Sequence, residues 1–179
     1  MTERELIEGC LRGERAAQEE LFRRYSGKML AVCRRYARHE MEAEDLLQEA
    51  FIRVFDRLSQ FKHQGSFEGW IRRIVVHTVL KHFRKASTQR EQIGLPEFVE
   101  GEYIDPSALQ HLQEEELLKL IAALPDGYRL VFNLYAIEGY SHKEIAQLLG
   151  IGESTSRSQF LKARKTLQAQ LRKLLSIFV

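Results

Sequence analysis

Apolar residues recur every three or four positions along most of this 179-residue chain, a spacing that indicates amphipathic α-helices. The first of only three prolines stands at position 96, so no proline interrupts the earlier pattern. No stretch sustains the strict alternation of apolar and polar residues that half-buried strands show, and no internal repeat is present. The pattern predicts an all-α fold.

The helical pattern is lost once, between residues 86 and 111. This stretch contains two glycines and two prolines and has no stable apolar period, which is typical of a linker. We therefore expect two small helical domains, 1–90 and 112–179, joined by a flexible linker at 91–111.

The second domain contains the pattern of a helix-turn-helix. Its first two helices are expected at 112–124 and 128–137. Ser141 and Glu144 occupy the reciprocal positions of a capping box, which predicts the start of a third helix, and Gly150 ends that helix. A fourth, basic helix follows after a turn that contains glycine. In this arrangement the second helix of the motif enters the major groove of DNA.

The fourth helix, which starts near Ser154, separates its residues into two sides on a helical wheel. The side expected to face the core consists of Ser156, Phe160, Ala163, Leu167, Leu171 and Leu174. On the other side, small hydroxyl groups allow close approach, and Arg or Lys side chains can bond to guanine edges or to phosphates. The candidate DNA contacts are Ser154, Thr155, Arg157, Ser158, Lys162 and Lys165. A solvated basic surface helix is the alternative interpretation of the charge alone.

A further amphipathic helix is predicted at 42–61 in the first domain. Its core side consists of Leu47, Ala50, Phe51, Val54, Phe55 and Leu58. Its other side carries a continuous row of Asp45, Gln48, Glu49, Ile52 and Asp56, called the acidic row below. An isoleucine exposed among acids suits the docking of a basic partner helix, although single exposed apolar residues are also common without any function.

The composition is that of an ordinary globular chain, with 44% hydrophobic residues and a formal net charge of +2. No apolar run approaches the roughly 20 residues that span a bilayer, and the N-terminus lacks the apolar region of a signal peptide. We therefore expect a cytoplasmic protein without membrane insertion. Cys10 and Cys33 stand apart from any C-x-x-C or histidine cluster, so we expect reduced, partly buried thiols and neither a metal nor a cofactor.

The sequence does not indicate an enzyme. The six histidines are scattered, and no H-E-x-x-H, P-loop or nucleophile-elbow motif occurs. The acidic row faces outward, whereas a metal-dependent nuclease needs an inward cluster of carboxylates. The charges are instead ordered in blocks. Between 70 and 90 there are six basic residues and no acid, between 91 and 118 there are eight acids and no Lys or Arg, and no acid follows Glu153.

Two parts of the chain resemble one family of proteins. AEDLLQEAFIRVF at 43–55 and FEGWIRRIVVHTVLKHFRK at 67–85 are similar to region 2 of bacterial sigma factors of the extracytoplasmic function (ECF) group. LPDGYRLVFNLYAIEGYSHKEIAQLLGIGESTSRSQFLKARKTL at 124–167 is similar to their region 4. The resemblance implies a subunit that binds core RNA polymerase, directs it to promoter DNA and helps to open the duplex. It also implies an anti-sigma factor as a partner. A freestanding helix-turn-helix regulator is the alternative.

The resemblance assigns roles to residues of the first domain. The residues that would contact the coiled coil of the polymerase clamp are Asp45, Leu46, Gln48, Glu49, Ile52 and Asp56. The loop at 59–66 matches the family's specificity loop, which takes a base flipped out of the minus-ten element. Its candidate residues are Phe61, Lys62 and His63, although Phe61 can equally belong to the core.

The helix after this loop presents a second candidate contact with the minus-ten element. One stripe of it carries Arg73, His77, Leu80 and Arg84, with Lys81 at its edge, while Ile71, Ile74, Val75 and Thr78 are expected to face the core. A basic stripe of this kind can hold phosphates and single-stranded bases. Trp70 at the start of the helix can stack on a base, but an aromatic residue there is more often part of the core.

The chain departs from the family pattern at several of these positions. His77 stands where the family usually has Asn, Lys81 stands where it often has Asp, and S-T-S-R-S-Q at 154–159 replaces G-T-V-K-S-R. The promoter sequence therefore cannot be copied from relatives. The acidic linker would thread the RNA-exit path of the polymerase. We expect transcription initiation or promoter escape to change when the linker is neutralised by substitution of Glu97, Glu100, Glu102 and Asp105.

Overall fold

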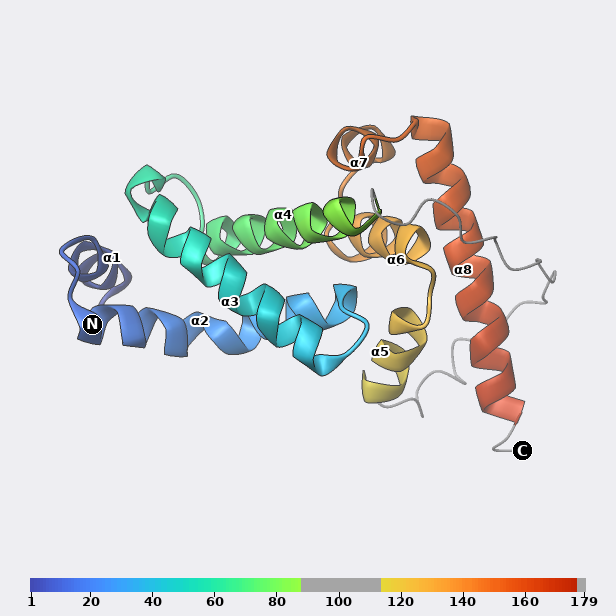
Figure 1. Ribbon diagram of the computed structural model, residues 1–179, viewed down its shortest axis with the longest axis horizontal. Coiled ribbons are helices and arrows are strands. Elements are labelled where there is room, and N and C mark those ends of the chain that lie inside the picture. The colour runs from blue at the N-terminus through green and yellow to red at the C-terminus, as the bar shows by residue number, and fades with distance from the viewer. Residues whose placement is uncertain (88–113, 177–179) are drawn as a thin grey trace. The chain divides into compact units, whose positions relative to one another are not determined.

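The computed structural model describes residues 1–87 and 114–176 (Figure 1), and every regular element in them is a helix. This confirms the predicted all-α class. The chain divides into two compact units, Met1–His82 (unit 1) and Phe83–Val179 (unit 2). The predicted linker at 91–111 lies outside the described residues, as do its acids Glu97, Glu100, Glu102 and Asp105. The domain boundaries at 90 and 112 stay a prediction.

Unit 1 is built from long helices whose ends follow local sequence signals. Its elements are α1 (Glu3–Leu11), α2 (Arg15–Tyr36), α3 (Glu40–Arg57), the short 3-10 turn η1 (Leu58–Gln60) and most of α4 (Phe67–Ser87). Thr2 and Glu5 form a capping box at the start of α1. His39 caps α3 by accepting a hydrogen bond at Nδ1 from the backbone N–H of Glu42, at 3.2 Å.

The core of unit 1 draws apolar side chains from all four helices. Leu6 of α1, Leu21 of α2, Leu46 of α3 and Ile71 of α4 are all buried. Full burial of each such side chain contributes about 1.5–3 kcal/mol, so this core is the main source of the unit's stability. The core side predicted for α3 is confirmed, with Phe55 half-buried and the other members buried, namely Leu47, Ala50, Phe51, Val54 and Leu58.

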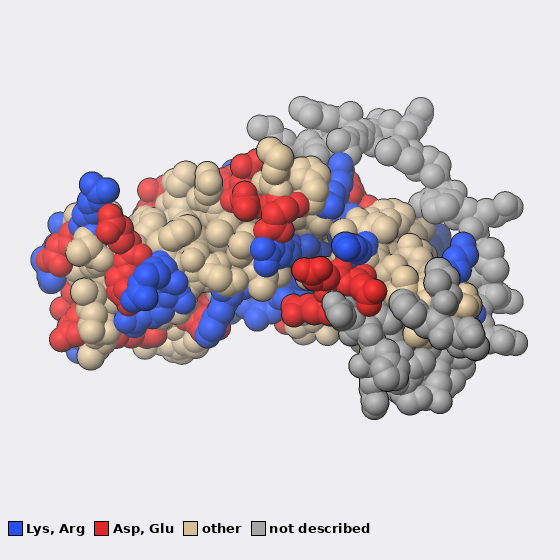
Figure 2. Space-filling view, turned by 90° about the horizontal axis from the view of Figure 1, so that it is seen from below, with Lys and Arg blue, Asp and Glu red and all other residues tan. Residues whose placement is uncertain are grey.

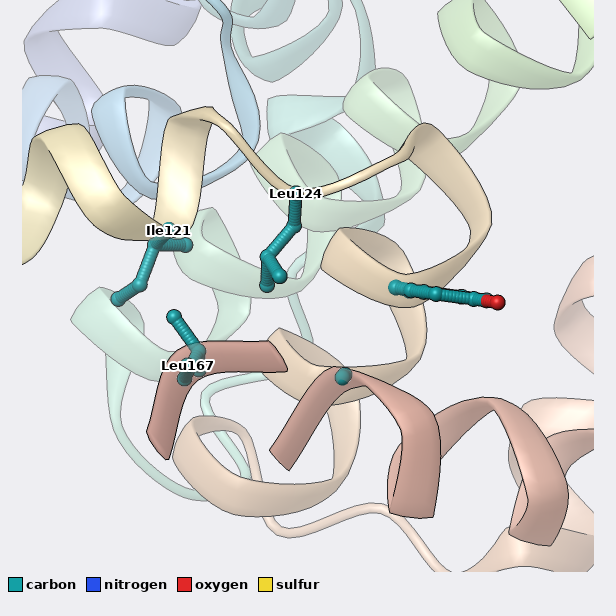
Figure 3. Close-up of a cluster of buried hydrophobic side chains, with 5 residues drawn as sticks. Ile121, Leu124 and Leu167 are labelled. Atoms are coloured by element: carbon teal, nitrogen blue, oxygen red, sulfur yellow. The ribbon is translucent and has the colours of Figure 1, made fainter. Parts of the chain in front are cut away.

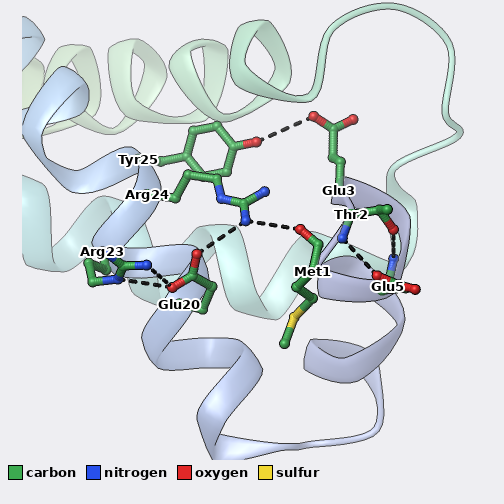
Figure 4. Close-up of polar contacts among 8 residues, drawn as sticks. All are labelled: Met1, Thr2, Glu3, Glu5, Glu20, Arg23, Arg24 and Tyr25. Atoms are coloured by element: carbon green, nitrogen blue, oxygen red, sulfur yellow. Dashed lines mark hydrogen bonds and ion pairs between the residues drawn. The ribbon is translucent and has the colours of Figure 1, made fainter.

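Figure 4 shows how the N-terminus is attached to α2. The guanidinium of Arg24 donates hydrogen bonds to the backbone oxygen of Met1 and to the Glu20 carboxylate, each at 3.1 Å. The hydroxyl of Tyr25 donates to the carboxylate of Glu3 at 3.3 Å. Hydrogen bonds from Arg23 and Arg24 lower the pKa of Glu20 below its ordinary value. Polar contacts thus fix the first residues on the outer side of the helical core.

Unit 2 contains the predicted helix-turn-helix. Its described elements are α5 (Glu114–Ala122), α6 (Asp126–Phe132), the π-helical turn η3 (Asn133–Ile137), α7 (His142–Leu149) and α8 (Glu153–Ser176). The helix expected at 128–137 therefore starts two residues earlier, and its last turn is π-helical. The capping box of Ser141 and Glu144 is present, and Gly150 ends α7 with φ 68°, as predicted.

A small apolar cluster holds α5, α6 and α8 together. It consists of Ile121, Leu124, Tyr128, Ala163 and Leu167. Figure 3 shows Ile121 and Leu124 pointing toward Leu167 of α8. The cluster confirms Ala163 and Leu167 as core residues of α8, together with Ser156, whose side chain is also buried.

Candidate partner and nucleic-acid interfaces

The acidic row on α3 lies on the surface of unit 1. Asp45, Gln48, Glu49 and Asp56 are exposed, and Ile52 has 62% of its surface accessible. Leu46, which the resemblance had included among the polymerase contacts, is only 1% exposed. Its side chain lies in the core, out of reach of a docked protein, so the direct contact predicted for it is corrected.

The charge of the acidic row is partly compensated from within α3. Arg53, one turn after Glu49, donates to the Glu49 carboxylate at 2.5 Å. Such an i, i+4 pair at the surface is weak, because water competes with it and two long side chains must be ordered. A partner cation can therefore replace Arg53 at low cost.

An apolar groove continues the surface beside the acidic row. It is lined by Arg15, Gln18, Glu19, Phe22 and Phe55. Phe22 is 40% exposed and packs its edge against Phe51, with ring centroids 4.8 Å apart. Phe55 lies one helical turn from Ile52, so the apolar contact area of this face extends beyond the single isoleucine found in the sequence pattern.

The loop between η1 and α4 is supported by an aromatic cluster. Phe61 is 8% exposed, and its ring lies 4.9 Å from the rings of His63 and Phe67 and 5.4 Å from that of Trp70. Phe67 and Trp70 are nearly parallel, at 13°. Phe61 therefore belongs to the core, which settles the alternative left open by the sequence. Only Lys62 and His63 of the predicted pocket residues are exposed.

His63 adopts an uncommon backbone conformation in this loop. Its φ is 54°, and it is the only non-glycine residue with a positive φ in the part of the chain that the structure describes. This conformation carries a modest energetic cost for a residue with a Cβ, and it turns the chain sharply between Lys62 and Gly65. The ring contact with Phe61 holds the His63 side chain in place despite its exposure.

The basic stripe of α4 is present with one change. Arg73, His77, Lys81 and Arg84 are exposed and form the stripe, but Leu80 is only 3% exposed. Leu80 follows the buried Val76 by four residues, so it shares the core side of the helix, and its place in the stripe is corrected. The predicted core side is confirmed by Ile71, Ile74, Val75 and Thr78, all of which are buried.

His77 contributes a neutral donor and acceptor to the basic stripe. Partial burial lowers its pKa below the ordinary value of 6.5, and the positive charges of Arg73 and Arg57 lower the pKa further. The imidazole is therefore uncharged at neutral pH. In a row of cations it offers hydrogen bonds to a base, whereas its neighbours offer charge to phosphates.

The N-terminal part of α8 presents the predicted DNA contacts. The helix begins at Glu153, one residue before the predicted start. Ser154, Thr155, Arg157 and Ser158 are exposed, while Lys162 and Lys165 are half-buried along their aliphatic stems. The structure brings all six residues together on one helix, but their individual contacts with DNA stay a prediction.

Arg157 is paired with an acid of its own helix. Its guanidinium donates to the Glu153 carboxylate at 2.5 Å, and the side chains of the two residues are 64% and 46% exposed. The sequence pattern did not single out Glu153, although it stands four residues before Arg157. Because both groups are exposed, water and salt weaken the pair and leave Arg157 available for exchange with another anion.

Figure 2 shows acidic and basic side chains interleaved over the α1 end of unit 1. Three of the ion pairs there are Arg4 with Glu8, Arg12 with Glu14, and Arg15 with Glu19. Their charges largely cancel at a distance. The basic stripe of α4 contains no acid, so it is better suited to a polyanion than the α1 end is.

The two cysteine thiols are both buried. Cys10 and Cys33 are free cysteines, and burial raises the pKa of Cys33 to about 12. Within residues 1–87 and 114–176 no three His, Cys, Asp or Glu side chains gather in a way that would hold a metal ion. Among the same residues, no helix has both the length and the apolar character to span a membrane.

Comparison with known proteins relates both units to one family. Residues 21–89 match the family model for sigma-70 region 2, and residues 114–167 match the family model for sigma-70 region 4. The two matches together cover more than half of the chain. They coincide with the acidic row and basic stripe in unit 1 and with the helix-turn-helix in unit 2.

Several proteins that are similar over nearly the whole of this chain are sigma factors. The RNA polymerase sigma-H factor of Pseudomonas aeruginosa is 28% identical over 97% of this chain and 95% of that protein. The ECF RNA polymerase sigma-E factor of Escherichia coli K12 is 27% identical over 98% of this chain and 97% of that protein. The ECF sigma factor SigE of Mycolicibacterium smegmatis is 32% identical over 90% of this chain and 65% of that protein.

The fold is also that of a solved sigma factor. The sigma factor RpoE of Bartonella quintana, determined in complex with the anti-sigma factor NepR, superimposes with a TM-score of 0.53 at 19% identity. The match covers 87% of this chain and 96% of that chain. None of the similar proteins named here is an enzyme.

Proposed function

The chain belongs to the ECF group of the sigma-70 family and directs transcription initiation as a sigma factor. From this premise we propose which surface of the chain binds which partner. Its partners are core RNA polymerase and promoter DNA. Residues 1–90 bind the polymerase and the minus-ten element, residues 112–179 bind the minus-thirty-five element, and residues 91–111 link the two. A freestanding helix-turn-helix regulator is not favoured, because it has no use for a region 2 domain.

The observation that carries this proposal is the presence of two surfaces of opposite charge on the helices α3 and α4. The acidic row of α3 surrounds the exposed Ile52, and the basic stripe of α4 contains no acid. A basic protein helix fits the first surface and a nucleic acid fits the second. A subunit that holds polymerase and DNA at the same time needs both.

In this proposal the acidic row binds the coiled coil of the polymerase clamp. Ile52 supplies a central apolar anchor, and Asp45, Glu49 and Asp56 surround it with charges that pair with cations of the partner. Glu49 exchanges its contact with Arg53 for a contact with the partner, which the exposure of that pair permits. The half-exposed Phe22 in the adjoining groove adds contact area.

The loop and α4 bind the opened minus-ten element. Extracting a base from the stack costs a few kcal/mol, so a binding site must offer compensating contacts. Lys62 and His63 lie at the exposed turn above the aromatic cluster, and Arg73, Lys81 and Arg84 supply cations along the adjacent helix. Phe61 supports the loop from beneath and does not stack on the base itself.

The N-terminal part of α8 enters the major groove at the minus-thirty-five element. Thr155 and Arg157 stand on its first turns, where a recognition helix meets base edges, and Lys162 and Lys165 reach toward phosphates. Each good base contact is worth about 1–3 kcal/mol of discrimination, so two or three suffice to select a promoter element when polymerase supplies the remaining affinity.

The protein is further proposed to act in the cytoplasm, where polymerase and chromosome are found, and to lack catalytic activity of its own. An anti-sigma factor is a third proposed partner. Support comes from the Bartonella quintana relative, which was solved with the anti-sigma factor NepR bound. The polymerase-binding face of unit 1 is a suitable target, because covering it prevents assembly of the holoenzyme.

Assembly with polymerase tests the proposal at Ile52. The Ile52→Asp variant adds a charge where an apolar anchor is proposed, and we expect its affinity for core RNA polymerase to fall by at least about tenfold, as at an interface hot spot. Fluorescence anisotropy of labelled protein titrated with core enzyme measures this affinity. Transcription from a promoter library then shows whether promoter-specific transcripts need both components.

The matched control is Leu11→Asp. Leu11 is another exposed apolar residue, 52% accessible at the end of α1 and outside the acidic row. We expect the control to bind polymerase as the unaltered protein does. Equal binding by both variants, or tight and specific promoter binding by the protein without polymerase, contradicts the proposal.

A further inference from the structure

A fully buried hydroxyl lies at the start of the proposed recognition helix. Ser156 is 0% exposed and stands between Thr155 and Arg157, which are both exposed. Burying a hydroxyl without a partner costs about 1–3 kcal/mol, so such a group is expected to be hydrogen-bonded. Whatever holds Ser156 also determines where its two neighbours point, because all three belong to one helical turn.

The partner of this hydroxyl is an imidazole on the other helix of the motif. The Oγ of Ser156 lies 2.9 Å from Nδ1 of His142, within hydrogen-bond distance. His142 is the first residue of α7 and directly follows the capping residue Ser141. A single contact therefore joins the first turn of α7 to the first turn of α8.

The imidazole is itself fixed by aromatic neighbours. Tyr135 of η3 stacks on His142, with ring centroids 4.3 Å apart and an angle of 13° between the planes. Phe160 of α8 meets His142 nearly edge-on, at 5.9 Å and 62°, and Phe160 also packs on Tyr135 at 4.6 Å. The ring therefore has little freedom to rotate away from Ser156.

The surroundings of His142 favour its neutral form. Burial lowers its pKa below 6.5, the nearby Arg157 lowers it further, and Glu153 opposes these effects. A neutral imidazole can accept a hydrogen bond from the Ser156 hydroxyl at Nδ1 or donate one, depending on the tautomer.

We propose that the His142–Ser156 contact is a positioning device, which sets the angle at which α8 presents Thr155 and Arg157 to the minus-thirty-five element. Neither residue touches DNA in this proposal. A hydrogen bond requires a definite distance and direction, whereas purely apolar packing of α7 on α8 tolerates small sliding movements. The inference rests on the proposed role of α8 in DNA recognition.

Base preference, measured with the assembled holoenzyme, tests the inference. A promoter library randomised in the minus-thirty-five element is transcribed with the unaltered protein and with the Ser156→Ala, His142→Ala and His142→Asn variants. Asparagine is the conservative variant, because its amide group can take the place of Nδ1. The control is Thr166→Ala, since the Thr166 hydroxyl bonds only to the Lys162 backbone within α8.

We expect Ser156→Ala and His142→Ala to lower the preference for the best element over single-base mismatches by about tenfold, as a shift of the contacting side chains implies. His142→Asn is expected to restore most of this preference, and Thr166→Ala to leave it unchanged. In the free protein, the ¹⁵N resonance of His142 Nδ1 should move in Ser156→Ala and stay in place in Thr166→Ala.

A merely structural role gives a different result. In one such result, total transcription falls while the ranking of minus-thirty-five sequences stays the same. In another, His142→Asn loses as much base preference as His142→Ala. Either outcome overturns the inference. If Ser156→Ala does not fold, the two His142 variants decide the question by themselves. Failure of the unaltered protein to direct promoter-specific transcription would instead overturn the proposed function, so the two failures are distinguishable.

Discussion

Arg129 shows how much a single residue can contribute without any signal in the sequence. It is a cation with 1% exposure inside unit 2. Its guanidinium donates to the backbone oxygens of Leu124 at 2.7 Å and Ala122 at 3.2 Å, and to the Asp126 carboxylate at 2.7 Å. It thereby supplies donors to backbone carbonyls at the end of α5 and just beyond it, where a helix leaves its last carbonyls without intrahelical partners. A basic residue on a short helix is ordinarily exposed, so its burial was not predictable.

Replacement of Arg129 by methionine keeps much of its volume and removes its donors. We expect Arg129→Met to lower the free energy of unfolding by about 3 kcal/mol, because two backbone carbonyls lose the hydrogen bonds of a buried guanidinium. Urea denaturation followed by circular dichroism measures the change. Arg164→Met, at an exposed position of α8, should cost less than about 0.5 kcal/mol. Equal effects of the two changes would refute this role of Arg129.

At the scale of elements, helical periodicity predicted most of what the structure shows. It located α3, α4, α7 and α8 and the core sides of α3 and α4, since burial of one side is what produces the period. It misplaced Leu80, which was assigned to the basic stripe of α4 and is buried, while the contact expected of the buried Leu46 came from the family resemblance and not from the period. The groove and the His142–Ser156 contact join residues of different helices, and the aromatic cluster depends on how its loop folds, so helical periodicity cannot reveal them.

Two glycines test how a side chain is tolerated at a helix end and inside a helix. Gly150 ends α7 with φ 68°, whereas Gly27 lies within α2 and has open space where a Cβ would stand. We expect Gly150→Ala to lower the free energy of unfolding by about 1 kcal/mol, because alanine is strained in the left-handed region. Gly27→Ala should raise it by about 0.5–1 kcal/mol through helix propensity. Thermal denaturation of both variants measures the signs, and a common sign would contradict this explanation.

At the scale of the whole molecule, the proposed function uses one unit for polymerase and opened DNA and the other for duplex DNA. In this proposal each basic surface alone makes few contacts, so both must bind one promoter to hold it. Charge cancellation at the α1 end, seen in Figure 2, keeps the remainder of unit 1 from attracting DNA without specificity. The sigma-factor family could be predicted from the sequence and the division of roles between the units stays a prediction, whereas the compensation of individual charges was not predicted.

Salt dependence of promoter binding tests the basic stripe in the assembled holoenzyme. Each phosphate contact adds about 0.7–0.9 to the slope of log affinity against log salt concentration, because bound counterions are released. We expect Arg73→Gln to reduce this slope by that amount. Arg4→Gln, which removes an exposed cation already paired with Glu8, should leave the slope unchanged. An unchanged slope in Arg73→Gln would argue against phosphate contact by this residue.

If Arg157 contacts DNA as proposed, its ion pair with Glu153 makes promoter recognition an exchange reaction. Arg157 would then reach the groove with an anion already bound, so a DNA acceptor must displace a carboxylate rather than fill an empty site. The complex with the promoter therefore gains only the difference in free energy between the bond of Arg157 to DNA and its bond to Glu153, which are similar in strength. A sequence without a well-placed acceptor leaves Arg157 with Glu153 and gains nothing from it, while the carboxylate repels nearby phosphates. The resident acid thus lowers affinity, and only an acceptor that binds Arg157 more tightly than Glu153 does gains a contact from this residue.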